Sequence, residues 1–360
     1  MNHESTTPRR SSHRGPHVEN LSQTPPERKS SASEEPSRNW FSAHLFVEPV
    51  EEGYRGDRVL TEAVDKWLED CRHETRITRH FFIRYGELGS HIRLRIEGED
   101  GSVLDWARDL ISRSARLSSS LDSDEFGVYQ KSNHDLISHV RFIDYEPELT
   151  RYGGRQAVEV AESLFHLSSE TCLHLLKLDS TGDPALRRAF GLLAILTLIQ
   201  AMADGDEEYE ADLAAAYRDF GWDIHQYGSR ATAGAREPEA AWRASFEGGY
   251  SRQSDELIHQ VGELRTRLSE SRGQGPEPFR GYHDGLKSAR QSLGRLWRRG
   301  LLGPGLRRSP ALPESWEQRL LTLSSSYLHM TSNRLGLSAL DEAYLAEMAR
   351  RIVADQVPKS

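Results

Sequence analysis

The sequence predicts an α+β protein, with a small antiparallel sheet near the N-terminus packed on a mainly helical body. Two observations carry this prediction. Short segments in which apolar and polar residues alternate are confined to residues 40–145, whereas apolar residues recur at helical spacing from residue 155 onward. No internal repeat is visible, which argues against a solenoid or a propeller.

The alternating segments predict four strands of one sheet. They cover residues 40–47, 80–85, 91–96 and 139–145. The last strand should end before Pro147, because proline cannot donate to a ladder interior.

The remaining periodic segments predict helices. Asp57 is expected to cap a helix over 57–72, and Ser338 with Asp341 resembles a capping box. The other predicted helices cover residues 103–116, 155–178, 184–203, 207–220, 239–247, 250–271, 282–299, 314–334 and 338–355.

Composition separates a tail from one domain. Residues 1–38 are rich in Ser, Pro, Arg and Glu, so we expect a disordered tail before a single domain over 39–360. The tail lacks the apolar run of a secretory signal. The most apolar run, residues 190–203, is short for a membrane span and contains Gln200. These features predict a cytoplasmic protein that does not insert into membranes.

Charge and cysteine content exclude further classes. The net charge of −9 and the lack of a basic stripe argue against a nucleic-acid partner. Cys71 and Cys172 have no ligand-type neighbours, so we expect free thiols rather than a disulfide or a zinc site. His166 and His174 on the predicted helix 155–178 are interpreted as structural, and no metal motif is found.

The segment over residues 80–96 predicts a hairpin with a cationic face. Alternation places His91, Arg93 and Arg95 on one face of the second strand, and Arg84 is expected to join the same group. Several guanidiniums on a short sheet face suggest a bound anion or a developing negative charge. An Arg-rich solvated face paired with local acids is an equally weighted alternative.

A second polar cluster lies on the predicted helix 314–334. Ser325, Ser326, His329 and Asn333 fall on one helical face. A half-buried histidine in this position can act as an acid or a base. For an isolated histidine, one that is satisfied by local hydrogen bonds is the more frequent case.

Five motifs in collinear order resemble one known family. They are Trp40-Phe-Ser-Ala-His-Leu-Phe, Phe82-Ile-Arg-Tyr, His91-Ile-Arg-Leu-Arg, Tyr145-Glu-Pro-Glu-x-x-Arg-Tyr-Gly-Gly and His329-Met-x-x-Asn-Arg-Leu. Together they are similar to the C-terminal domain of lantibiotic dehydratases, which also occurs alone as thiopeptide-type bacteriocin biosynthesis proteins. The resemblance runs from residue 40 to the C-terminus.

The resemblance implies one of two reactions on a ribosomal precursor peptide, neither with a metal or redox cofactor. The first eliminates glutamate from glutamylated Ser or Thr to give dehydroamino acids. The second, a pyridine synthase reaction, joins two dehydroalanines by a formal [4+2] aza-cycloaddition with loss of water and the leader peptide. Because the positively charged motif positions are intact, elimination is favoured by a narrow margin.

Roles for single residues follow from the resemblance and from the chemistry of both reactions, with Tyr327 and Ser325 as proton carriers for cycloaddition. The expected catalytic residues are His329, Arg93, Arg95, Arg151, Tyr327 and Ser325. The expected substrate-binding residues are Arg84, Tyr85, His91, Tyr152, Asn333 and Arg334. The expected partners are a precursor peptide with its leader and a glutamylating dehydratase subunit, while a homodimer stays open. A non-enzymatic peptide-binding adaptor is the remaining alternative.

Overall fold

The computed structural model confirms the α+β fold. The chain divides after Ser37, and every described residue lies in the second part. The structure describes residues 39–47, 55–74, 77–86, 89–98, 137–179, 182–231, 277–303 and 315–356, with a few single positions between them. The predicted tail lies outside the described residues, and the predicted helices 103–116, 239–247 and 250–271 lie almost wholly outside them.

The four predicted strands form one antiparallel sheet. They are β1 (Asn39–Val47), β2 (Ile77–Tyr85), β3 (His91–Gly98) and β4 (Ile137–Phe142), in the order β2-β3-β1-β4. β1 is a central strand that pairs with both β3 and β4. β4 ends at Phe142, three residues earlier than predicted, and irregular chain then leads to the next helix.

Helices and the segments that join them make up the rest of the described chain. They are α1 (Arg55–Arg58), the π-helical η1 (Val59–Val64), α2 (Asp65–Glu74), α4 (Leu149–Tyr152), α5 (Arg155–Leu178), α6 (Pro184–Ala203), α7 (Glu207–Ala231), α10 (Glu277–Arg298), α11 (Trp316–Leu335) and α12 (Ala339–Gln356). The limits of α5 and α6 agree with the prediction. The predicted cap before α12 is confirmed, because the Ser338 hydroxyl accepts from the Asp341 amide and donates to its carboxylate.

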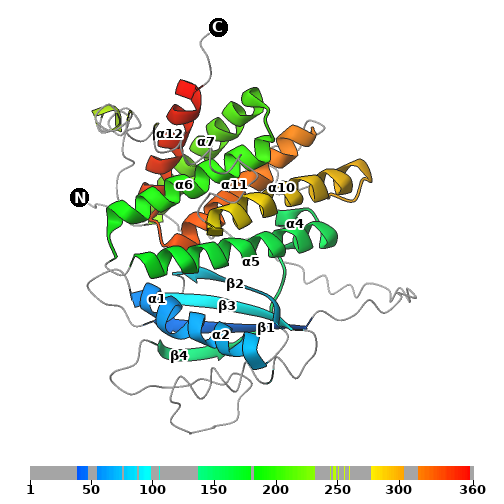
Figure 1. Cartoon of the computed structure of the whole chain (residues 1–360), viewed down its shortest axis with the longest axis vertical. Coiled ribbons are helices and arrows are strands. Elements are labelled where there is room, and N and C mark those ends of the chain that lie inside the picture. The colour runs from blue at the N-terminus through cyan, green and yellow to red at the C-terminus, as the bar shows by residue number, and fades with distance from the viewer. Residues whose placement is uncertain are drawn as a thin grey trace, which may run out of the picture. The chain divides into compact units, whose positions relative to one another are not determined.

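Helix α5 separates two layers. The sheet lies on one side of α5, and α6, α7, α10, α11 and α12 lie on the other (Figure 1). The helical segment α1–η1–α2 covers one face of the sheet, where Phe82 and Leu94 meet Leu60 and Leu68 in a buried cluster. Apolar burial of this kind is the main stabilising term in folding.

Side chains of two helices cover the outer edge of β2. The Phe82 amide donates to Ser169 Oγ of α5 at 3.2 Å. The Arg84 amide donates to Asn333 Oδ1 of α11 at 2.8 Å, and Asn333 Nδ2 returns a bond to the Arg84 carbonyl at 2.9 Å. An open strand edge leaves backbone groups unpaired, so these bonds both satisfy the edge and attach the sheet to the helical body.

A buried ion network ties α1 to three other elements. Asp57 lies inside α1 rather than at its cap, which corrects the prediction. Its carboxylate binds the guanidiniums of Arg84 and Arg187, the latter at 2.6 Å. Arg187 of α6 also binds Asp179 at 2.7 Å. Buried guanidiniums need such partners, because an isolated charge in the interior is costly.

Helix α6 is the one described helix whose length and composition would allow a membrane span. The expectation that this run is too short is therefore corrected, since the helix extends over 20 residues. Its 18-residue apolar window is 61% buried inside the protein, as in the core helix of a water-soluble fold.

Replacing Asp57 by Ala should destabilise the fold strongly. The change leaves the buried Arg187 and the half-buried Arg84 short of a counter-ion, so we expect the free energy of unfolding to fall by about 3–5 kcal/mol. Urea denaturation measures this loss. Glu62→Ala, which breaks an exposed pair with Arg58 on the same helical segment, should cost no more than about 0.5 kcal/mol. Equal losses in the two variants would contradict a central role for Asp57.

Candidate functional site

The pairing of β2 with β3 decides which arginines share a face. Arg93 is opposite Ile83, and Arg95 is opposite Phe81. Arg84 is opposite Ile92 and therefore points to the other face, towards Asp57. The expectation that Arg84 joins the same group is wrong, because directly paired residues of an antiparallel ladder lie on the same face.

Two further strands extend the positively charged face. His44 of β1 pairs with Arg93 on one side and with Arg141 of β4 on the other. We call the set His44, His91, Arg93, Arg95 and Arg141 the cationic face. Among the described residues, no carboxylate forms an ion pair with its three arginines.

Arg95 is the most buried arginine of the cationic face. Its side chain lies over the rings of Phe81 and Tyr145, at 5.4 and 5.0 Å from their centroids, and only 8% of the residue is exposed. Its Nε and Nη1 have no hydrogen-bond partner among the described residues. Burial lowers the pKa of Arg95 to about 10, and Arg93 acts in the same direction. The group nevertheless stays charged at neutral pH.

Arg93 lies flat over an aromatic ring at the end of the hairpin. Its guanidinium is 3.4 Å from the centroid of Tyr85, and its Nε donates to His91 Nε2 at 3.2 Å. His91 Nδ1 lies 2.9 Å from the Gly89 carbonyl, so the neutral ring donates there and accepts from Arg93. Burial lowers the pKa of His91, which agrees with this neutral form.

A second group forms where α4 meets α11. Arg151 Nε donates to Ser326 Oγ at 3.1 Å, and the Ser326 hydroxyl donates to the Tyr152 hydroxyl at 3.3 Å. The Tyr152 ring stacks parallel to the ring of Tyr327 at 5.7 Å. Glu148 accepts from Arg151 at 3.0 Å and also acts electrostatically on Arg95. Glu148 therefore connects this group to the cationic face.

Histidine 329 is oriented by a carboxylate from the next helix. Its Nδ1 lies 2.9 Å from Glu342 Oε2, and its side chain is 25% exposed. The buried Glu342 also accepts from the Tyr217 hydroxyl at 2.8 Å. This bond fixes the ring and directs Nε2 away from the carboxylate, as in histidines that transfer protons.

Helix α11 carries His329 between two residues that contact the other groups. Ser326 and Asn333 lie one turn before and one turn after His329 on the same side of the helix, since positions three and four apart are neighbours. Ser326 contacts Arg151, and Asn333 contacts the backbone of β2 next to the strand position that pairs with Arg93. The imidazole thus lies between the two attachments of α11.

Three residues that were predicted to bind substrate use their side chains for contacts within the fold. The Asn333 amide is used by the β2 backbone, and Arg84 binds Asp57. Arg334 is fully buried, lies 4.8 Å from the Phe165 centroid and donates from Nε to Ser169. Ser325 and Tyr327 are also buried on α11. We therefore leave Arg84, Asn333 and Arg334 out of the site proposed below.

Several residues that complete this region are not indicated as functional by the sequence pattern. Glu342 belongs to none of the recognised motifs, and it reaches His329 only because α12 packs against α11. His44 and Arg141 lie on β1 and β4, and the alternation within a strand does not predict which strands are neighbours in the sheet. Tyr145 and Glu148 lie within one of the recognised motifs, which is the signal that could have pointed to them.

Comparison with known proteins identifies the family. The family model described as "Lantibiotic biosynthesis dehydratase C-term" matches residues 40–353. The subtilin biosynthesis protein SpaB of Bacillus subtilis is 29% identical over 123 residues, which are 34% of this chain and 11% of SpaB. The chain therefore spans a small part of that relative's length.

Three solved structures share the fold. TsrL has a TM-score of 0.60 at 16% identity, and the match covers 89% of this chain and 95% of TsrL. TbtD, a pyridine synthase from thiomuracin biosynthesis, has a TM-score of 0.60 at 14% identity, covering 88% of this chain and 98% of TbtD. The tRNA-dependent lantibiotic dehydratase MibB from Microbispora sp. 107891 has a TM-score of 0.56 at 20% identity, covering 91% of this chain and 29% of MibB.

The fold and the family match define a class of peptide-modifying proteins of antibiotic biosynthesis. This chain belongs to the lantibiotic biosynthesis dehydratase C-terminal family. The family supports an enzyme that modifies ribosomally made peptides.

Acidification should destabilise the fold through His44. Burial lowers its pKa from 6.5 to about 3, and Arg93, His91, Arg95 and Arg141 act in the same direction. Because the unfolded chain takes up the proton first, this contribution is complete above pH 6.5 and is lost as the pH falls towards 3.

A pair of variants measures that contribution. Urea denaturation of His44→Gln at several pH values between 7 and about 4 should give a shallower loss of stability than the unsubstituted protein. His174→Gln changes an exposed histidine of α5 and should keep the original slope. An unchanged slope in His44→Gln would show that His44 titrates normally.

Proposed function

We propose that this protein eliminates glutamate from glutamylated Ser or Thr residues of a precursor peptide. The observation that carries the proposal is the cationic face. Arg93, Arg95 and Arg141 share one side of the sheet without a carboxylate partner among the described residues. Placing arginines side by side, one of them buried, is costly, and a bound anion would offset that cost.

Elimination needs a base and a place for negative charge. In the proposed reaction His329 Nε2 removes the Cα proton of the modified residue, and Glu342 stabilises the imidazolium that forms. Electrons of that C–H bond form the new double bond while the Cβ–O bond breaks. Glutamate then leaves as a carboxylate, towards Arg93 and Arg95.

Arg151 is the group that joins the two ends of this proposed site. It donates to Ser326, one helical turn before His329, and binds Glu148, whose charge acts on Arg95. In that position a guanidinium can stabilise negative charge that develops on the substrate carbonyl. Tyr85 and His91 hold Arg93 in place, and Tyr152 supports Ser326.

The partners follow from this reaction. The substrate is a precursor peptide with its leader, and a separate dehydratase subunit loads the glutamate. No metal or redox cofactor takes part in the proposed chemistry. A cytoplasmic location agrees with a substrate that is made on the ribosome.

Cycloaddition of two dehydroalanines is the second candidate. The parallel stack of Tyr152 and Tyr327 and the aromatic surroundings of Arg95 favour it, because flat apolar groups can align two alkenes. Burial raises the pKa of both tyrosines, so their hydroxyls stay protonated and are suited to donate hydrogen bonds.

Two synthetic peptides distinguish the candidates. Purified protein is incubated with a leader-bearing peptide that contains glutamylated Ser, and separately with one that contains two dehydroalanines. Mass spectrometry should detect loss of glutamate from the first peptide. Release of the leader from the second, with new pyridine absorbance, would instead support cycloaddition and overturn the proposal.

Replacing His329 by Ala should slow glutamate elimination by about 10²–10⁴-fold, because a positioned general base contributes that much. Glu342→Gln should give a smaller loss with the same sign, since the ring stays but its orienting charge is gone. The assay is the mass-spectrometric one above. His174→Ala is the matched control. An adaptor without catalysis would keep full pathway output in His329→Ala.

Double replacement of Arg93 and Arg151 by Lys should also impair elimination strongly. Lysine keeps the charge but cannot reproduce the planar, bidentate geometry of a guanidinium. We expect the rate constant to fall by at least about 10²-fold, as for loss of an oxyanion donor. Arg58→Lys, at an exposed pair, is the control. Unchanged turnover in the double variant would remove both arginines from the proposed site.

A further inference from the structure

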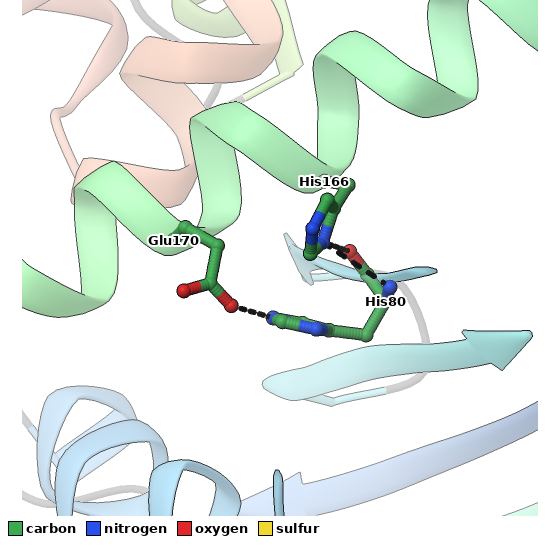
Figure 2. A group of neighbouring side chains, drawn as sticks. All are labelled: His80, His166 and Glu170. Carbon is green, nitrogen blue, oxygen red and sulfur yellow. Dashed lines mark hydrogen bonds and ion pairs between the residues drawn. The ribbon is translucent and has the colours of Figure 1, made fainter. Parts of the chain in front are cut away.

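A group of three metal-ligating side chains lies away from the proposed active site. His166 and Glu170 are one turn apart on α5, so both point to the same side of the helix. His80 reaches them from the edge strand β2 (Figure 2). One ligand atom from each side chain falls within 4.8 Å of the other two.

The imidazole of His80 is poorly explained by the protein alone. The residue is fully buried, and neither ring nitrogen forms a hydrogen bond with a described residue. Its Nε2 lies 3.0 Å from Glu170 Oε1 as an ion-pair contact without hydrogen-bond direction. Two ligands of one tetrahedral zinc ion lie about 3.3 Å apart, given bonds of about 2.0 Å. The observed spacing therefore needs little change to accept an ion.

The second histidine is held as a metal ligand is usually held. His166 Nδ1 lies 3.1 Å from the His80 carbonyl oxygen and 3.3 Å from the His80 amide nitrogen, so the backbone of β2 holds the ring in either tautomer. With the proton on Nδ1, the ring donates to the carbonyl. Metal-bound histidines commonly donate their other ring N–H to a carbonyl, which fixes the tautomer and the ring orientation. A ring that is held in this way through Nδ1 would bind an ion through Nε2.

We propose that His80, His166 and Glu170 form a zinc site that fastens β2 to α5. Two imidazoles and one carboxylate suit a borderline-soft ion such as Zn²⁺ rather than Ca²⁺ or Mg²⁺, which prefer all-oxygen sites. Glu170 is 39% exposed on its side chain, so an ion can enter from solvent. Three protein ligands leave the fourth position for water.

The site is separate from the proposed elimination chemistry. The proposed zinc site includes His80 of β2, whereas Asn333 of α11 contacts the same strand four residues later, at Arg84. Zinc there would stabilise the junction of sheet and helical body without contacting substrate. The sequence analysis interpreted the histidines of α5 as structural. The third residue of the group, His80 of β2, is 86 positions away from His166, so no local motif indicates the site.

Zinc titration of the full chain tests the proposal. Chelator-treated protein is titrated with ZnCl₂ in a calorimeter at neutral pH, and melting is recorded with and without the ion. We expect one saturable site and a rise in Tm of roughly 2–5 °C at saturating zinc. Because His80 is fully buried, replacing it risks unfolding, so the half-buried His166 and Glu170 carry the test.

Matched variants locate the binding. His166→Ala and Glu170→Gln should bind zinc at least about 10-fold more weakly. Mutation of a residue that only hydrogen-bonds to a metal ligand already costs that much affinity, and loss of a ligand should cost no less. His174→Ala, exposed on the same helix, should bind as the unsubstituted protein does. Absence of saturable binding would overturn the proposal. Equal binding by all four proteins would overturn it too, because the ion would then bind elsewhere, for instance to His3, His13 and His17 of the N-terminal segment.

Discussion

The outer edge of β2 is the constraint on which the rest of the structure depends. In the described part of the chain no further strand pairs with this edge, and its backbone is bonded instead to side chains of α5 and α11, through Ser169 and Asn333. These bonds hold the sheet in one register against the helical body. Without them the strand would expose unpaired donors, and the cationic face would have no fixed relation to His329.

The covered edge also limits how a peptide can bind. Addition of a substrate strand to a sheet needs a free row of backbone donors and acceptors. At β2 the alternate amides of Phe82 and Arg84 are already bonded. A leader that binds by strand addition therefore cannot use β2, and β4 is the other edge strand of this sheet.

The distribution of carboxylates explains why an acidic protein can hold a cationic face. Asp57 and Asp179 are used by Arg187 and Arg84, and Glu97 is bound by Arg79. These pairs stabilise the junctions between elements and leave Arg95 buried without a counter-ion among the described residues. A group that destabilises the fold in this way is typical of a functional site, where selection tolerates the loss.

The sequence predicted elements more successfully than it predicted faces. The limits of α5 and α6 follow from apolar period and flanking residues, because the signals that begin and end a helix are local in the sequence. The assignment of Arg84 failed, because alternation along a strand does not say which strand residues are paired. The hairpin register places Arg84 opposite Ile92 and so on the face away from Arg93. That register depends on the turn after Tyr85, which sequence pattern describes least well.

The same limit applies to the orienting residue of His329. A histidine with hydroxyls one turn away can be recognised on a helix. The carboxylate that orients the imidazole ring, however, comes from α12 and is 13 positions away in the sequence. The sequence therefore indicates which side chains are reactive, whereas only packing between elements gives them partners. Side-chain bonds from α5 and α11 to β2 attach the helix that carries this histidine to the sheet that carries the arginines. The proposed reaction depends steeply on the alignment of base and leaving group. In that proposal the side-chain bonds along β2 would therefore affect the rate without touching the substrate.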